Sequence, residues 1–369
     1  MKTILLSAAL LLTVGAQAQT TLVDSIVSNG IYRNYRLYTP AVYTGTTARP
    51  LVINMHGYTS NASDQQLYSN FMPIADTANF LMVCPNGTSS GGSQYWNAGI
   101  SSAGANDILF IDELITHLKQ SYNIDLNRVY ATGMSNGGFM SHTLACTLNN
   151  KIAAIASVTG SIFTTQYSTC APNRAVPIMQ IHGTADATVP YVGNSTMVSV
   201  ANVVNYWVTN NNCTATPVFT AIPNTNTLDG CTAERYVYNN GTNGSTVELF
   251  KIIGGAHTWP GAPVTIGVTN QDISASKEIW RFFSKYKLSQ FTAIDAINNA
   301  NKLRLYPNPA NNSIVIDDIN AATVLKITNV LGKEMSTTQY QNIDISGLTT
   351  GVYTIEIVGT NQRLKFIKE

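Results

Sequence analysis

The sequence predicts a large α/β domain, in which a mainly parallel sheet has helices on both faces, followed by a small all-β sandwich. Three observations support this architecture. Short apolar runs typical of buried parallel strands alternate with amphipathic segments over roughly 250 residues. A polar stretch, IDAINNAN, follows, and the chain beyond it alternates apolar and polar residues between Gly and Asn turns, as antiparallel strands do. A chain of 369 residues is long enough for one large and one smaller domain.

The individual elements follow from the period of the apolar residues. Runs such as LVINM and FLMVC are continuous and apolar, whereas DILFIDELITHLKQSY carries apolar residues at helical spacing. Strands are predicted at 32–38, 51–55, 80–84, 129–132, 152–158, 178–181 and 247–253, and helices at 64–79, 107–122, 138–148, 197–209 and 274–286.

The N-terminus has the pattern of a secretory signal peptide. A basic start, Met1-Lys2, precedes the apolar run ILLSAALLLTVG and the small-x-small site Ala16-Gln17-Ala18. A membrane anchor is disfavoured, because the run is shorter than the ~20 residues of a spanning helix and no later segment supplies one. We therefore expect a signal peptide at 1–18, an α/β catalytic domain at 19–290, a linker at 291–302 and a β-sandwich at 303–369, with no stable membrane span.

The composition argues against a nucleic-acid partner. The formal net charge is +1, only 11% of the residues are charged, and Lys and Arg are not clustered as phosphate binding requires. We expect a neutral or mixed substrate instead.

The stretch VYATGMSNGG supplies the first candidate catalytic residue, Ser135. A predicted strand runs through Gly133-Met134-Ser135-Asn136-Gly137 into a predicted helix, which is the context of a G-x-S-x-G nucleophile elbow. Such a sharp turn strains the serine backbone and needs small residues two positions before and after it, here Gly133 and Gly137.

Two further candidates follow later predicted strands. Asp186 comes after the strand IMQI and His257 after VELFKII, so the three residues occur in the order Ser, Asp, His. A serine hydroxyl needs an imidazole to take its proton, and a buried carboxylate must hold that imidazole in the correct tautomer. The chain thus predicts a triad for acyl transfer.

The remaining site predictions concern the oxyanion and the cleft. The backbone N–H groups of Asn136 and Tyr58 are the expected oxyanion donors. We expect His56 to be structural, and Trp96 and Trp259 to be either core aromatics or walls of the substrate cleft, with Trp259 favoured as a wall because it lies two residues after His257. No cluster has metal-ligand spacing and no glycine pattern forms a phosphate loop, so no metal and no cofactor is predicted.

Five cysteines in an exported chain allow at most two internal disulfides. Cys84 lies in an apolar run and is the candidate free thiol. The sequence by itself leaves the pairing of Cys146, Cys170, Cys213 and Cys231 open.

The motifs NMHGYTSN, GMSNGGFMSHTLAC, IHGTADATVPY and GGAHTWPG resemble the secreted polyhydroxybutyrate depolymerases and feruloyl or acetylxylan esterases of the α/β-hydrolase superfamily, over about residues 28–288. The resemblance implies Ser135 as nucleophile, Asp186 as acid, His257 as base and Tyr58 with Asn136 as oxyanion donors. It also implies disulfides between Cys146 and Cys170 and between Cys213 and Cys231.

The C-terminal segment has its own resemblance. YPNPA, the NVLGK turn, ISGLTTGVYTI and the final LKFIKE resemble the sorting domain read by the type IX secretion system of Bacteroidetes. The alternative, a carbohydrate-binding module, is disfavoured because few aromatic residues are available to stack on sugars. The resemblance implies export through the periplasm to the cell surface or the medium, with the secretion machinery as a partner.

Together these observations predict a secreted serine carboxylic-ester hydrolase, similar to a polyhydroxybutyrate depolymerase, that forms an acyl-enzyme on Ser135. A feruloyl or acetylxylan esterase of plant cell walls is the alternative. A catalytically silent binding protein and a peptidase are weaker ones, since the triad is complete and the elbow and HTWPG motifs resemble esterases.

Overall fold

A computed structural model describes residues 19–99, 104–292, 305–316, 323–339, 342–358 and 363–369. The chain divides into two compact units, residues 1–293 and 294–369, which we describe separately. The predicted signal peptide and most of the predicted linker lie outside the described residues. No helix among the described residues is long and apolar enough to cross a membrane.

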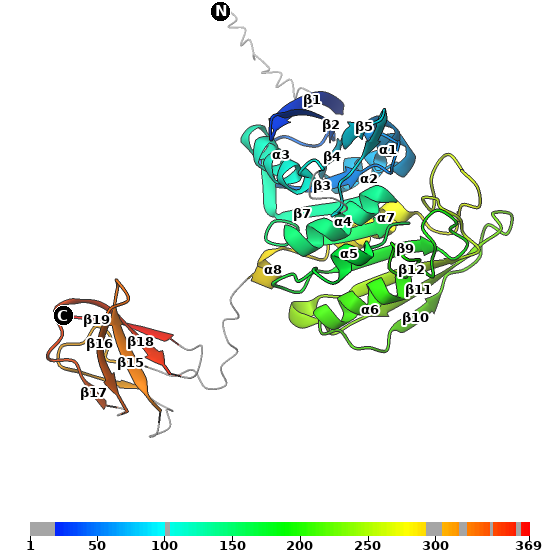
Figure 1. Ribbon diagram of the computed structural model, residues 1–369. Coiled ribbons are helices and arrows are strands. Elements are labelled where there is room, and N and C mark those ends of the chain that lie inside the picture. Colours follow the sequence, from blue (N-terminus) through cyan, green and yellow to red (C-terminus); the bar gives the residue numbers. More distant parts are fainter. Residues whose placement is uncertain (1–18, 100–103, 293–304, 317–322, 340–341, 359–362) are drawn as a thin grey trace, which may run out of the picture. The chain divides into compact units, whose positions relative to one another are not determined.

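The larger unit is built on a ten-stranded sheet with the order β1-β2-β4-β3-β7-β8-β9-β12-β11-β10 (Figure 1). The six strands from β4 to β12 in this order run parallel, and antiparallel strands flank them at both edges. The strands are β1 (Thr20–Ser28), β2 (Ile31–Thr39), β3 (Arg49–Met55), β4 (Leu81–Pro85), β7 (Ile124–Met134), β8 (Ala154–Val158), β9 (Ile178–Gly183), β10 (Val218–Ala221), β11 (Thr232–Tyr238) and β12 (Val247–Ile253).

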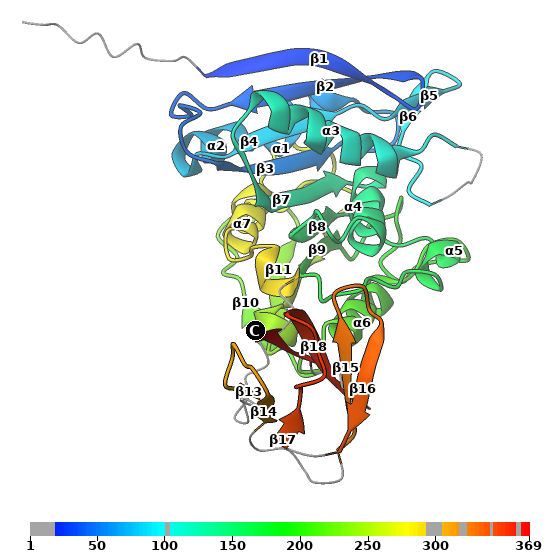
Figure 2. The same ribbon diagram turned by 90° about the vertical axis from the view of Figure 1, so that its left-hand side faces the viewer.

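Helices cover both faces of this sheet, as Figures 1 and 2 show. Alternate residues of the parallel strands enter two separate cores, so that Leu51 and Ile53 of β3 face one core and Val52 the other. The first core contains α3 (Asp107–Ser121), α4 (Asn136–Thr147) and α6 (Val200–Asn210); the second contains α1 (Ala62–Ser69), α2 (Met72–Ala78) and α7 (Ala275–Phe283). Shorter elements are the β5–β6 hairpin (Thr88–Ser90 and Ser93–Tyr95), α5 (Thr164–Tyr167), α8 (Ser289–Thr292) and the 3₁₀ turn η1 (Thr242–Gly244).

The unit differs from the sequence prediction in several places: no strand was predicted for β1, β5 or β6, and two further differences have a clear local cause. The helix predicted at 64–79 is two helices, because Asn70 adopts a left-handed conformation (φ 52°) and Pro73 begins a new first turn in α2. The segment 210–244, for which the sequence analysis predicts no strand, contributes β10 and β11 to the sheet. The edge strand β10 is exposed along its length and β11 is mostly half-buried, so the apolar run that predicts a buried strand is missing.

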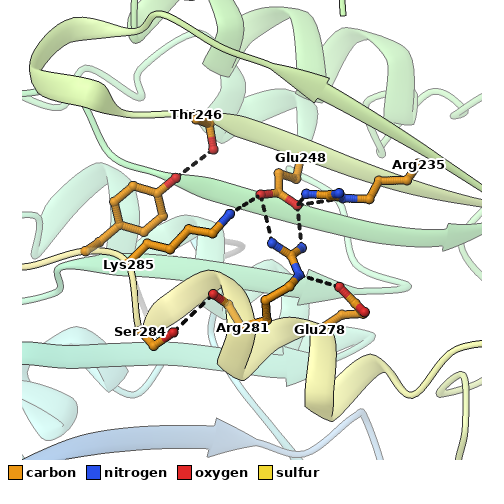
Figure 3. A network of polar contacts seen from close by, with 8 residues as sticks. Arg235, Thr246, Glu248, Glu278, Arg281, Ser284 and Lys285 are labelled. Carbon is orange, nitrogen blue, oxygen red and sulfur yellow. Dashed lines mark hydrogen bonds and ion pairs between the residues drawn. The ribbon is translucent and has the colours of Figure 1, made fainter. Parts of the chain in front are cut away.

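Helix α7 is tied to the sheet by a charge cluster around Glu248 of β12 (Figure 3). The buried Glu248 carboxylate accepts from Arg235 of β11 at 2.8 Å, from Arg281 of α7 at 2.6 Å and from Lys285 at 3.2 Å. Glu278 pairs with Arg281 at 2.6 Å. Arg235, Arg281 and Lys285 thus compensate the charge of the buried Glu248 carboxylate, on the side of the sheet that α7 covers.

The smaller unit consists of two antiparallel sheets around an aliphatic core. Buried Ile314, Ile327, Ile355 and Phe366 come from both sheets, which is the arrangement of a β-sandwich. Its strands are β13 (Leu305–Tyr306), β14 (Ser313–Ile316) and β17 (Asn342–Asp344) in one sheet, and β16 (Glu334–Thr338), β15 (Leu325–Asn329), β18 (Gly351–Ile357) and β19 (Arg363–Lys368) in the other.

Candidate active site

The turn between β7 and α4 holds Ser135 in a strained conformation. Its backbone has φ 54° and ψ −120°, values that residues other than glycine rarely adopt. A Cβ on Gly137 would lie 2.1 Å from the carbonyl oxygen of Met55, and one on Gly133 would lie 2.5 Å from the same oxygen. Both glycines therefore allow β7 and α4 to pass β3 at close range, which is the packing that the elbow pattern predicts.

Asp186 and His257 lie after the neighbouring parallel strands β9 and β12, and so at the same edge of the sheet as Ser135. The ring Nδ1 of His257 is 2.7 Å from Oδ2 of Asp186. A glycine makes this approach possible, because a Cβ on Gly183 would lie 2.2 Å from the carbonyl oxygen of Gly255. The backbone N–H of Ala185 donates to that oxygen at 3.0 Å, which locks the two loops together.

The Asp186 carboxylate is buried but surrounded by N–H groups. Its Oδ1 accepts from the backbone N–H groups of Thr188 at 2.9 Å and Val189 at 2.8 Å. Its Oδ2 faces two rings, His257 and, at 3.3 Å, His182. Burial acts to raise the pKa of Asp186, but the hydrogen bonds from His182, His257 and Val189 outweigh it and hold that pKa well below its usual range. Asp186 is therefore an anion at neutral pH.

Ser135 and His257 line the same cavity, whose volume is about 800 Å³. No hydrogen bond joins the Ser135 hydroxyl to the His257 ring among the contacts of the described residues. Nucleophile–base contacts in hydrolases are commonly looser without substrate than in the reacting complex. The ring of His257 remains partly exposed, with 19% of its side-chain surface accessible, so a substrate can reach it.

Two backbone N–H groups lie close to Ser135 without a partner among the described residues, those of Tyr58 and Asn136. Asn136 is the first residue of α4, where helix N–H groups have no intrahelical acceptor. A Cβ on Gly57 would lie 3.4 Å from Cβ of Ser135, so the loop carrying Tyr58 packs directly on Ser135. Both predicted oxyanion donors are therefore near Ser135 and, within the described part of the chain, free to donate.

The Asn136 side chain has a separate role. Its Oδ1 accepts from the backbone N–H of Trp96 at 2.6 Å and its Nδ2 donates to the Trp96 carbonyl at 3.0 Å. This two-way pairing joins the segment after β6 to the first turn of α4.

Trp96 and Trp259 are core residues and do not line the cavity, which corrects their predicted role as substrate-binding walls. Trp96 is fully buried, donates from Nε1 to the carbonyl of His56 at 3.0 Å and stacks on Phe110. Trp259 is 1% exposed and donates from Nε1 to Oγ of Ser276 at 3.1 Å. Both indoles satisfy their single N–H inside the protein, which is how a buried tryptophan is usually accommodated.

His56 is also buried, as expected for a structural histidine. Its Nε2 accepts from the backbone N–H of Gly87 at 2.9 Å, and its Nδ1 lies 2.7 Å from the carbonyl of Gly57. Burial lowers its pKa to about 4. No group of three or more His, Cys, Asp or Glu side chains is placed to hold a metal ion in the part of the chain that the structure describes.

The walls of the cavity are apolar residues that the sequence analysis did not single out. They come from α1, α2, the end of β7 and the loop after His257, and they include Leu67, Tyr68, Met72, Met134, Pro263, Val264 and Ile266. The usable signal was apolar side chains in a loop rich in Pro and Gly, GAPVTIGV, because an irregular surface segment has no need of them unless they contact a ligand.

The cysteines confirm one predicted disulfide and correct the other. Cys146 and Cys170 are bonded, with Cα atoms 5.1 Å apart. Cys213 and Cys231 are free, as is Cys84, so Cys84 is not the lone thiol. Cys231 immediately precedes β11, whereas Cys213 lies beside the segment that follows β11. A seven-residue strand, about 23 Å long at ~3.3 Å per residue, therefore separates the two sulfurs.

The sheet order, the helices on both faces and the elbow after a central strand define an α/β-hydrolase domain. Residues 95–217 match the family model "Phospholipase/Carboxylesterase", and residues 304–369 match the "Secretion system C-terminal sorting domain". The fold class and both resemblances are confirmed at this level.

Several of the similar proteins are esterases by name. The chain is 30% identical over 171 residues, 46% of this chain, to the bifunctional acetylxylan esterase/xylanase XynS20E of Neocallimastix patriciarum, and 30% identical over 229 residues, 59% of this chain, to feruloyl esterase B of Piromyces equi. It spans only 24% and 41% of the lengths of these two relatives. The structure of acetyl xylan esterase from Aspergillus awamori aligns with a TM-score of 0.54 at 15% identity, over 71% of this chain and 99% of that one. This likeness concerns the fold.

Proposed function

We propose that the protein is a secreted serine carboxylic-ester hydrolase with Ser135 as nucleophile, His257 as general base and Asp186 as the carboxylate that orients it. The observation that carries this proposal is the 2.7 Å contact between His257 Nδ1 and Asp186 Oδ2 at the rim of a cavity that also contains Ser135. With Nδ1–H donated to Asp186, the Nε2 atom of His257 is left as the proton acceptor.

The reaction then follows from the atoms present. Ser135 Oγ attacks the ester carbonyl while its proton passes to His257 Nε2, and the backbone N–H groups of Tyr58 and Asn136 stabilise the oxyanion. The imidazolium returns the proton to the leaving alkoxide, which departs as the alcohol. Water, activated by the same ring, releases the acid from Ser135.

The cavity supports an ester with a bulky apolar acyl group. Its walls are mostly aliphatic and aromatic, and a volume of about 800 Å³ is far more than an acetyl group fills. Together with the named relatives, this favours a hydroxycinnamoyl ester of plant cell-wall polysaccharide, the alternative in our sequence analysis. A polyhydroxyalkanoate is the second candidate, since the open apolar cavity also suits its methyl-branched chain.

We propose further that residues 1–18 and the sorting domain deliver the enzyme through the periplasm to the cell surface or the medium, with the type IX secretion machinery as partner. The match over residues 304–369 supports this route.

The test is a substrate panel of methyl ferulate, short 3-hydroxybutyrate oligomers, acetylated xylan and a peptide amide, assayed with wild type and Ser135→Ala. We expect methyl ferulate to give the highest kcat/KM and Ser135→Ala to lower it by on the order of 10⁴-fold or more while the fold is kept. Wild-type turnover in Ser135→Ala would refute the mechanism, and preference for the oligomers or the amide would replace the substrate class.

A further inference from the structure

A chain of buried side chains runs from the candidate site into the first core. His182 Nε2 lies 3.3 Å from Oδ2 of Asp186, and His182 Nδ1 lies 3.1 Å from Nε2 of Gln180. Oε1 of Gln180 is 3.0 Å from Nε2 of His142, whose Nδ1 is 3.2 Å from the indole Nε1 of Trp207. These four side chains beyond Asp186 are at most 1% exposed, so bulk water cannot replace any of the contacts.

The fold explains why these residues meet. Gln180 and His182 are two residues apart on β9 and therefore point to the same face of the sheet. That face is covered by α4, which carries His142, and by α6, which carries Trp207. The chain thus links the helix behind the nucleophile to the strand that leads to Asp186.

The donor and the acceptor of each hydrogen bond in this chain can be assigned, beginning with Trp207. An indole N–H can only donate, so Nδ1 of His142 must accept. Burial lowers the pKa of His142 to about 4, so the ring is neutral at pH 7 and its one proton is on Nε2, which donates to Gln180.

The hydrogen bonds of Gln180 independently assign the proton of His182. A carbonyl oxygen can only accept, and that of Gly160 is 2.8 Å from Nε2 of Gln180, which fixes the orientation of the amide. The second N–H of Gln180 then donates to Nδ1 of His182. The proton of His182 is therefore on Nε2, facing Oδ2 of Asp186 and the carbonyl of Val189 at 2.9 Å.

We infer that His182, held by Gln180, His142 and Trp207, is a positioning residue for Asp186. Its one Nε2–H lies between the carbonyl of Val189 at 2.9 Å and, at 3.3 Å, the same Asp186 oxygen that accepts from His257, so rotation of the carboxylate would break both ring contacts of that oxygen. The inference rests on the proposed function, in which Asp186 orients the catalytic base. Every donor in the chain is a neutral group, and the charge of Asp186 is stabilised without being cancelled.

The tautomers can be measured directly in the full wild-type chain labelled with ¹⁵N-histidine. Long-range ¹H–¹⁵N correlation spectra at pH 7, assigned with single His→Gln variants, should show neutral rings protonated on Nε2 for His142 and His182. His257 should be protonated on Nδ1, the opposite tautomer. A proton on Nδ1 of His182 or of His142 would overturn the inference.

Kinetics test the consequence. His182→Leu should lower kcat on p-nitrophenyl acetate by roughly 10- to 100-fold with little change in KM, because a misplaced base affects the transition state more than binding. His182→Gln, whose amide N–H can replace the Nε2–H, should recover most of the loss and also serves if the leucine variant does not fold.

The matched control is Asn211→Leu, which removes a fully buried amide at the end of α6, bonded to the backbone of Val176 at 2.9 and 2.6 Å. It should leave kcat unchanged. An equal loss of kcat in this control, or equal kcat in His182→Leu and wild type, would refute the positioning role. Ser135→Ala, assayed in parallel, separates the two proposals: if it retains turnover, the proposed function fails, whereas if it is inactive and His182→Leu is fully active, only the positioning inference fails.

Discussion

Asp186, in the loop after β9, and Glu248, on the neighbouring strand β12, are both buried carboxylates, yet the protein surrounds them with different chemistry. Asp186 is held by backbone N–H groups and two imidazole rings. Glu248 is held by two arginines and a lysine. In both cases burial raises the carboxyl pKa and the partners lower it further than burial raises it.

The two carboxylates differ in whether neighbouring cations compensate their negative charge. Three cations compensate Glu248, so its field does not reach beyond the cluster and its role is to join α7, β11 and β12. Asp186 has no Lys or Arg partner among the described residues, so its field acts on the His257 ring. A charge about 4 Å from a forming imidazolium stabilises it by on the order of 4 kcal/mol at an effective dielectric constant of ~20. In the proposed mechanism, Glu248 is thus a structural carboxylate and Asp186 the one that acts on the base.

The largest expected effect is that of Asp186→Asn. The amide keeps the shape but removes the charge, and it permits the wrong tautomer of His257, so kcat should fall by about 10⁴-fold. Steady-state kinetics on a soluble ester, with circular dichroism as a check of the fold, measure this. Retention of more than a tenth of the activity would remove Asp186 from the proposed mechanism.

Glu248→Gln should have the opposite effect to Asp186→Asn, lowering stability while leaving kcat unchanged. Loss of the anion leaves Arg235 and Lys285 without their Glu248 partner and Arg281 with Glu278 alone, so the free energy of unfolding should fall by about 3 kcal/mol. kcat per folded molecule should stay at the wild-type value. Urea unfolding at pH 7 checks the first statement and an active-site-titrated assay the second; a fall in kcat would mean that the two carboxylates are not separate in function.

The pH dependence of stability sharpens the comparison. Because the pKa of Glu248 is lowered in the folded protein, its stabilisation is fully present above the unfolded value of about 4.3 and is lost as the pH falls toward the folded value. The difference in unfolding free energy between wild type and Glu248→Gln should therefore be constant from pH 8 to 5.5 and shrink below about pH 4.3. Urea titrations at pH 7, 5.5, 4 and 3 measure it, and a difference that grows on acidification would contradict the assignment.

The smallest effect should come from Lys285→Gln. The Lys285 side chain is 45% exposed, so solvent screens its pair with Glu248 and the loss should be below about 1 kcal/mol. Arg281→Gln should cost more, because Arg281 also pairs with Glu278 and is less exposed. A larger loss for the lysine variant in urea unfolding would show that the cluster does not depend on burial in this way.

The sequence predicted those features that leave a local signature. Continuous apolar runs marked the central parallel strands, and the residues at their carboxyl ends included Ser135, Asp186 and His257. The outer strands β1, β10 and β11 were missed because strands that are exposed or only half-buried lack such runs. The disulfide between Cys213 and Cys231, implied by the family resemblance, is absent because β11 separates the two cysteines. Trp259 was misjudged because nearness to His257 in sequence does not determine which way a side chain points. The chain from Trp207 to Asp186 depends on β9, α4 and α6 meeting, which no single stretch encodes.

The exposed apolar side chains at the mouth of the cavity also affect how the protein meets a solid surface. Four of its side chains are 60 to 63% exposed: Tyr58, Leu67, Val264 and Ile266. Water spreads poorly over such a rim, so pressing it against a dry ester surface releases that water at little cost. The molecule would then adhere mouth first, with Ser135 facing the solid. The same adhesion would persist on surface that has already lost its ester groups, because it depends on the apolar rim and not on the scissile bond.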